Sequence, residues 1–221
     1  MDLQALRVSL LLAAATAACL LVIGLPLGYW LALTKSRLRA IIEPVVALPL
    51  VLPPTVLGFC VLVALGPRSP LGRALEDLIG GPVVFTFGGL LIASILYSLP
   101  FAVQPFAAAF SGVDVSLREA AACLAASRLR TFVEVILPLS GRGVLAGLIL
   151  SFAHTLGEFG VVVMLGGSIP GKTKVASIAL YDEVQNLNYE TAHAFALILL
   201  LLSFIMLFAM TLVQRRIASD K

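Results

Sequence analysis

One segment of the chain has the residues of a nucleotide-binding loop. Residues 166–173 read GGSIPGKT and fit the pattern G-x-x-x-x-G-K-[ST] letter for letter. In that pattern backbone N–H groups cradle phosphates, while Lys172 would contact the β- and γ-phosphates and Thr173 would hold Mg²⁺. The apolar stretch VVVMLGG runs into the segment, and KVASIALYDEV, which can form a helix, runs out of it. This order of elements is the one that a phosphate-binding loop requires.

Two ionisable residues, His154 and Glu158, lie in an otherwise apolar stretch. Their i, i+4 spacing places them on one face of a helix, where they can pair. Three interpretations are open: a structural pair between helices, a lining of a path for an ion, or a metal site with His193 as third ligand. No ligand spacing in the sequence indicates a metal site.

The composition is that of a membrane protein. Sixty per cent of the 221 residues are hydrophobic, 12% are charged, and the mean hydropathy is +1.07, whereas soluble domains carry about 25% charged residues. The net charge of +3 is too small to indicate nucleic-acid binding. A membrane span needs about 20 apolar residues. We predict one all-α transmembrane domain over residues 1–221, with five spans at roughly 8–33, 45–66, 84–108, 142–166 and 191–214.

The distribution of Lys and Arg predicts the orientation, because these residues favour cytoplasmic loops. Ten of the 15 basic residues lie in the loops 34–43 and 109–142 and in the C-terminal segment 215–221, which would all be on the same side of the membrane. We therefore expect the N-terminus outside, the C-terminus and the loop 109–141 in the cytoplasm, and the loop 167–190 outside. GGSIPGKT then faces a compartment where ATP is scarce. Five spans also leave no room for an α/β domain, so the segment is better interpreted as an external turn.

The predicted cytoplasmic loop contains a short helix. Ser116 and Glu119 have the spacing of a capping box, in which each side chain binds the other residue's backbone N–H. Several Ala residues follow, and Leu117, Ala121 and Leu124 would share one face. Pro138 is expected to interrupt the helical structure before the fourth span. By itself, this pattern also fits a plain surface helix that closes a loop.

The segment Glu119-Ala120-Ala121, with Ser127 and Pro138 downstream, resembles the EAA loop of ATP-binding-cassette (ABC) importer permeases. The resemblance implies that this helix inserts into a groove of the ATPase subunit and transmits its closure to the membrane spans. Where the family usually has Gly this chain has Ala125, so we expect a more regularly helical turn there. The residues expected to carry the coupling are Ser116, Glu119, Ala120, Ala121, Leu124, Ala125, Ser127 and Pro138.

Three further segments resemble the molybdate-type permeases of this family: LPLVLPPTVLG at 48–58, LGEFG at 156–160 and IPGKT at 169–173. The resemblance implies the type I ABC importer permease fold in a bacterial inner membrane, and a homodimer of this chain. It also implies a cytoplasmic ABC ATPase and an external oxyanion-binding protein. We expect no cofactor on this chain and no enzymatic activity of its own, since the partner ATPase would bind ATP and Mg²⁺.

Other functions stay open. The substrate could be tungstate or sulfate, which are tetrahedral dianions like molybdate. A stand-alone secondary transporter would normally show more spans and an internal repeat. An intramembrane enzyme would need a nucleophile elbow or a metal motif, and the sequence contains neither.

Residues of the predicted second span are candidates for the translocation path. Prolines remove backbone donors, so they predict either a harmless kink or a hinge beside the path. Thr55 could offer its hydroxyl to an oxyanion. The path or gate candidates are Pro53, Pro54, Thr55, His154 and Glu158. At the external rim, Lys172 and Lys174 are expected to dock the binding protein or to steer the anion.

Overall fold

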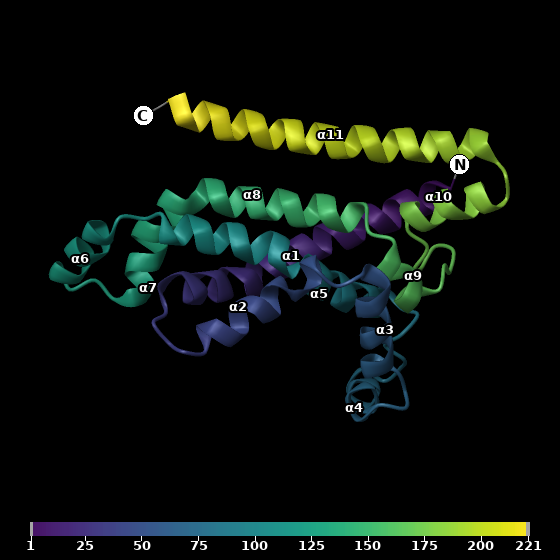
Figure 1. The fold of residues 1–221 in the computed structure, drawn as a ribbon, viewed down its shortest axis with the longest axis horizontal. Helices are drawn as coiled ribbons and strands as arrows, with labels where there is room; N and C mark the ends of the chain where they lie inside the picture. The colour runs from purple at the N-terminus through teal and green to yellow at the C-terminus, as the bar shows by residue number, and fades with distance from the viewer. Residues whose placement is uncertain (1, 220–221) are drawn as a thin grey trace.

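Three long apolar helices form the centre of the molecule (Figure 1). The computed structural model describes residues 2–219, and the side chains of residues 2–212. Helices α1 (Leu3–Leu33), α5 (Phe87–Ser111) and α8 (Leu137–Leu156) pack against one another, and α11 (Tyr189–Ser219) lies outside them against α8 and α10 (Ala176–Gln185). Within the described residues every regular element is helical. The predicted all-α fold is confirmed.

Glycines allow the central helices to approach closely. A Cβ added at Gly28 of α1 would lie 2.9 Å from the Cβ of Phe106 on α5, and one at Gly147 of α8 would lie 2.7 Å from the ring of the same residue. Phe106 is fully buried where the three helices meet. Small residues at such contacts are typical of membrane helices, whose association depends on close van der Waals packing.

The second predicted span is bent, not straight. Helix α2 (Arg39–Ala47) continues as the 3₁₀ turn η1 (Leu48–Leu50), and α3 (Pro54–Leu65) follows after a break with a bend of 113°. Pro53 and Pro54 lack the N–H groups that would continue the helix, and Pro53 is extended with ψ 136°. Helix α3 therefore turns away from the bundle and leads into α4 (Pro70–Ile79), which projects from the body (Figure 1).

The fourth predicted span begins and ends earlier than expected. Helix α7 (Arg128–Thr131), the π turn η2 (Phe132–Ile136) and α8 form one continuous helical stretch. The prediction of a break at Pro138 was wrong, because the preceding π turn accommodates the ring. The helix ends instead at Leu156, residues 157–159 are not helical, and the short helix α9 (Gly160–Gly166) follows. A Gly at this point is a common helix terminator.

The two large loops lie at opposite ends of the elongated molecule (Figure 1). Helix α6 (Val115–Cys123), α7 and the end of α11 are at one end, and α9, α10 and the start of α1 are at the other. The described residues contain four helices long and apolar enough to span a membrane, or five if the bent pair counts as one span. This agrees with about five predicted spans. Lys221, which contributed to the predicted cytoplasmic charge, lies outside the described residues.

Candidate functional site

The helix of the predicted coupling loop, α6, begins at Val115. Its N-cap is Asp114, whose Oδ1 accepts a hydrogen bond of 2.9 Å from the Ser116 N–H. This bond lowers the pKa of the Asp114 carboxyl. The prediction of a capping box between Ser116 and Glu119 was therefore wrong, because Ser116 lies inside the first turn. Asp is as good an N-cap as Ser, so the sequence alone offered two starting points.

Helix α6 ends in a left-handed turn. Ala125 has a φ of 55°, and the N–H of Ala126 donates to the Ala121 carbonyl at 3.0 Å, which closes the turn. The expectation of a more regularly helical turn at Ala125 was wrong. The conformation that favours Gly is kept although the residue is Ala, and this costs roughly 1–2 kcal/mol. Ser127 then caps α7, since its hydroxyl accepts from the Arg130 N–H at 3.2 Å.

The outer side of this loop is apolar and open. Leu124 is 83% exposed and Leu129 is 73% exposed, at an end of the molecule that also carries many charges. Of the predicted coupling residues Ala121 is buried, Pro138 lies exposed on α8, and the others are exposed around α6. They are Ser116, Glu119, Ala120, Leu124, Ala125 and Ser127.

The predicted pair of His154 and Glu158 does not form. His154 Nδ1 lies 2.9 Å from the hydroxyl oxygen of Ser98, which is also 2.9 Å from that of Thr155. The imidazole stacks on Phe101, with ring centroids 3.9 Å apart. Because α8 ends at Leu156, the i, i+4 spacing no longer puts Glu158 on the same helix face.

Glu158 occupies the break between α8 and α9. Glu158 is 4% exposed, and both of its carboxyl oxygens are buried without a hydrogen-bond partner. Its backbone is held, because its carbonyl accepts from the Ser177 hydroxyl at 2.5 Å. His193, the third ligand of the hypothetical metal site, lies on α11 with its Nδ1 against the Tyr189 carbonyl. The described residues contain no group of three side chains that could hold a metal ion.

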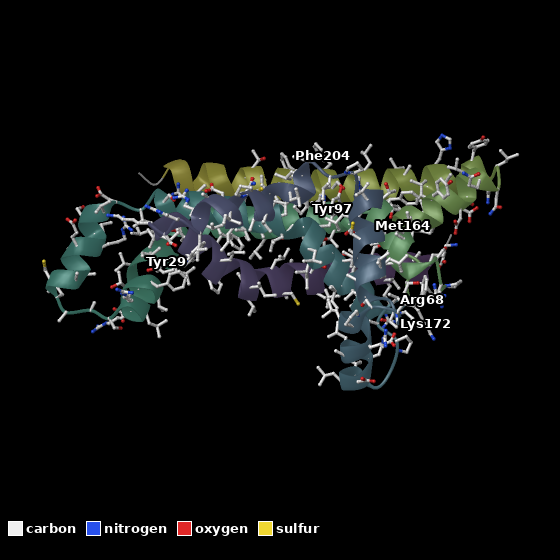
Figure 2. The ribbon with its side chains drawn as sticks, turned by 60° about the horizontal axis from the view of Figure 1, so that its bottom comes forward. Tyr29, Arg68, Tyr97, Met164, Lys172 and Phe204 are labelled. Carbon is white, nitrogen blue, oxygen red and sulfur yellow. The ribbon has the colours of Figure 1, made fainter. Side chains whose placement is uncertain are left out.

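Both helix breaks open onto one cavity of about 590 Å³. Its lining includes Pro54, Thr55, His154 and Glu158, so four of the five path candidates come together, while Pro53 is not part of the lining. Tyr97 from α5 is a further lining residue that the sequence did not single out (Figure 2). Its only signal was a polar hydroxyl in an apolar span. Irregular backbone at membrane depth is tolerated where it lines such a cavity.

The ends of α3 and α9 are in tight contact beside the cavity. A Cβ added at Gly160 would lie 2.6 Å from the Cβ of Pro54, and one at Gly58 would lie 3.0 Å from the Cβ of Met164. Leu57 and Val161 belong to the buried cluster between these two helices. The two breaks are therefore packed against each other, although they are far apart in the sequence.

The segment GGSIPGKT is a closed turn. The N–H groups of residues 172–174 all donate to the Ile169 carbonyl, so they do not point at a common anion. Thr173 is fully buried, and its hydroxyl donates to the Gly166 carbonyl at 2.6 Å. Lys174 forms an ion pair of 2.8 Å with Asp182 on α10. This geometry supports the interpretation as a turn and disagrees with a phosphate-binding loop.

The two lysines of this turn differ in their surroundings. The Lys174 side chain is 19% exposed and is paired, whereas Lys172 is exposed. Figure 2 shows Lys172 and Arg68 at the opposite end of the molecule from Tyr29. Of the two docking candidates, only Lys172 presents its charge freely to a partner.

Membrane-length helices and two helix breaks that meet at one cavity are the architecture of a membrane protein, and discontinuous helices around a cavity are common in transporters. The chain belongs to the family described as binding-protein-dependent transport system inner membrane component, which it matches over residues 24–219. It is therefore a multi-pass inner-membrane permease of an ABC importer. Such a system works with a separate ATPase subunit, which hydrolyses ATP, and with a binding protein.

Several curated relatives are similar over most of their length. The chain is 49% identical to the molybdenum transport system permease protein ModB of Azotobacter vinelandii over 209 residues, covering 95% of this chain and 92% of that protein. It is 37% identical to ModB of Escherichia coli K12, covering 77% and 76% of the two chains. It is 32% identical to a probable sulfate transport system permease protein of Prototheca wickerhamii, covering 80% and 69%.

Solved structures share the fold. A bacterial ABC transporter that imports the acidic polysaccharide alginate gives a TM-score of 0.78 at 18% identity, covering 97% of this chain and 79% of that chain. The MetNI methionine transporter in an inward-facing conformation gives 0.75 at 16% identity, covering 98% and 95%. At these identities the likeness shows the fold alone, and it confirms the predicted fold of ABC importer permeases.

Proposed function

We propose that this chain forms the membrane path of an ATP-driven importer of molybdate. The observation that carries the substrate is the 49% identity to a molybdenum permease over 95% of the chain. Sulfate is the second candidate, because a probable sulfate permease is 32% identical over 80% of the chain. Tungstate has the same shape and charge as molybdate, so the binding protein would have to select between them.

The assembly would contain two copies of this chain, two ATPase subunits of the ModC type and an oxyanion-binding protein of the ModA type. Helix α6 would contact the ATPase, because its C-cap Leu124 and the neighbouring Leu129 are exposed and could pack against an apolar groove. Lys172 would dock the binding protein or steer the anion at the other end. Rim charges of this kind mainly change association rates.

The cavity at the two helix breaks is the proposed part of the path. Thr55 and Tyr97 line it and can donate hydroxyl hydrogens to an oxyanion. The Glu158 carboxyl, which is 4% exposed, is largely withdrawn from an approaching dianion. The bent helices give this region the irregular backbone that a gate requires, because residues 51–52 and 157–159 can absorb changes in φ and ψ, whereas the ring of Pro53 fixes its φ.

The proposed orientation places α6 in the cytoplasm and α9 and α10 outside. Helices α6 and α7 carry Arg118 and Arg128, and the turn with Lys35 and Arg37 follows Thr34, which lines one cavity with both arginines. This gathering of basic residues is what the rule for cytoplasmic loops requires. A reporter fused after the last residue should be active in the cytoplasm, and one inserted between Arg68 and Arg73 should be active outside. The opposite pattern would contradict both the orientation and the proposed ATPase contact.

The test of the substrate is uptake by proteoliposomes that contain the chain, its ATPase and its binding protein. We expect ATP-dependent uptake of molybdate, with tungstate as a competitor and sulfate as a poor one. Faster uptake of sulfate than of molybdate would transfer the proposal to sulfate. Molybdate uptake that persists without the ATPase subunit would indicate a secondary transporter and contradict the proposal.

A further inference from the structure

A second, basic cavity lies where α1 ends against the coupling loop. Its volume is about 520 Å³. None of its lining residues is acidic, and the residues that could bind a ligand are Tyr29, Trp30, Thr34, Arg118, Arg128 and Thr131. Figure 2 shows Tyr29 beside the α7 region, at the coupling end of the molecule.

The arginines of this cavity have no charged partner among the described residues. Neighbouring arginines do, since Arg39 pairs with Glu43 at 3.0 Å and Arg130 pairs with Glu134 at 2.8 Å. Arg118 and Arg128 are in no such pair, so the cavity holds uncompensated positive charge. Lys35 and Arg37 in the nearby turn are in no such pair either, but they do not line the cavity.

Arg118 is also short of a hydrogen bond. Its Nε is buried and has no hydrogen-bond partner. A buried polar group without a hydrogen-bond partner is destabilising, and more so when the group is charged. Because Arg118 lines the cavity together with Tyr29 of α1, it faces inward, whereas Leu124 of the same loop is 83% exposed. An ATPase that docks on the exposed side therefore does not supply the missing acceptor.

The position of the cavity along α1 is that of the membrane surface. The sequence from Val8 to Leu33 has no charge, and α1 ends at Leu33. Trp30 lies in the last turn of that helix, and Trp and Tyr are enriched at the level of the lipid headgroups. The cavity therefore lies at the depth of phospholipid phosphates. Its lining also includes the partly exposed apolar residue Leu33, which suits the glycerol and upper acyl region of a lipid.

We propose that this cavity binds the phosphate headgroup of an anionic phospholipid. A guanidinium presents parallel N–H donors that match the oxygens of a phosphate. A phosphate oxygen would also give the buried Arg118 Nε–H the hydrogen-bond acceptor that it lacks. Basic pockets between membrane helices on the cytoplasmic side are suited to anionic headgroups. The lipid would join the end of α1 to α6 and α7, so it would connect the membrane span to the coupling loop. The site does not depend on which anion is transported.

Trp30 allows a direct test, because it is the only tryptophan in the chain. The full chain is reconstituted in phosphatidylcholine vesicles that contain increasing fractions of a lipid with brominated acyl chains, which quenches tryptophan on contact. The brominated lipid is phosphatidylglycerol in one series and phosphatidylcholine in the other. We expect half-maximal quenching at a roughly thirtyfold lower fraction of the anionic lipid, because two arginines at about 1 kcal/mol each contribute about 2 kcal/mol and every 1.4 kcal/mol is a factor of about ten.

The double variant Arg118→Gln, Arg128→Gln should lose this preference. The matched control is Arg37→Gln, Arg130→Gln, which removes the same charge from the same end outside the cavity and should keep the preference. The variant Arg118→Lys, Arg128→Lys keeps the charge but loses the paired donors, so it should retain only part of the preference. The lysine variant also provides the test if the glutamine variant does not insert into the membrane.

Three outcomes would overturn the proposal. Equal quenching by both lipids in the unchanged chain would mean that the cavity holds no anionic headgroup. Equal loss of the preference in the control pair would mean that general surface charge attracts the lipid. Abolition of the preference by inorganic phosphate in solution would show that the cavity binds a free oxyanion, with no need for a lipid.

Discussion

The coupling loop and the cavity at the helix breaks are assembled from the chain in different ways. The loop is closed by contacts between near neighbours, such as Asp114 with Ser116 and Ala126 with Ala121. The cavity brings together distant segments, such as Ser98 with His154 and Pro54 with Gly160. A local site can be recognised from a run of residues, whereas a site between distant segments depends on where each helix ends.

The largest effect should come from the exposed side of the coupling loop. Replacing Leu124 with Asp changes a side chain that is 83% exposed, so the chain should insert normally. A charge at the centre of an apolar contact should weaken ATPase binding by about a hundredfold, as for hot-spot residues. Co-purification of the ATPase with the tagged chain measures this.

The control is Leu187→Asp at the opposite end, where the side chain is 71% exposed. It should leave ATPase binding unchanged. If both variants retain the ATPase equally, α6 is not the contact, and the functional contrast between the two regions disappears.

In the cavity, the largest effect should come from Thr55. Thr55→Val keeps the shape of the side chain but removes a hydroxyl that lines the proposed path. The loss of one hydrogen bond to an anion, about 1.5–3 kcal/mol, should lower transport of molybdate at least tenfold. ATPase binding should not change, which separates this variant from Leu124→Asp.

Thr16→Val is the matched control for Thr55. The Thr16 hydroxyl is buried in α1 without a hydrogen-bond partner, so its removal takes away no interaction. Transport should therefore stay normal. Equal transport by the two variants would place Thr55 outside the path.

The different assembly of the two regions also explains what the sequence predicted. The spans were predicted from apolar runs and the coupling helix from one local motif. The structure has four span-length helices, a bent pair in place of the second predicted span, and a helix in the coupling loop. The left-handed Ala125 was missed because a propensity rule does not include the turn that surrounds the residue. The partner of His154 was missed because pairing on one helix face assumed a helix that continues past Gly157.

The polar contact that replaced the predicted pair should contribute to stability. Ser98→Ala removes the hydroxyl that joins His154 to Thr155 and leaves both without that partner. We expect a loss of about 1–3 kcal/mol in the free energy of unfolding, because buried polar groups lose their hydrogen bonds. Thermal unfolding of the detergent-solubilised chain measures this.

Ser111→Ala provides the comparison for Ser98 on the same helix. The Ser111 side chain is exposed and its hydroxyl donates only to the Ala107 carbonyl of its own helix, so its removal should cost little. Similar losses in the two variants would mean that the hydroxyl between α5 and α8 adds no stability of its own. The distant contacts of the cavity would then rest on apolar packing alone.

The smallest effect should come from the turn after α6. Ala125→Gly relieves a left-handed conformation, with a φ of 55°, that costs an Ala roughly 1–2 kcal/mol. Gly loses more backbone entropy on folding, which offsets about 0.5–1 kcal/mol of that gain. The net result should be a stabilisation of up to about 1 kcal/mol, seen as slower proteolysis of the coupling loop in the intact chain.

Ala126→Gly, next to it but without a positive φ, should lose stability from the same entropy term. If both variants are destabilised equally, the left-handed turn is not strained, and Ala would be as well suited as Gly to this position of the coupling loop.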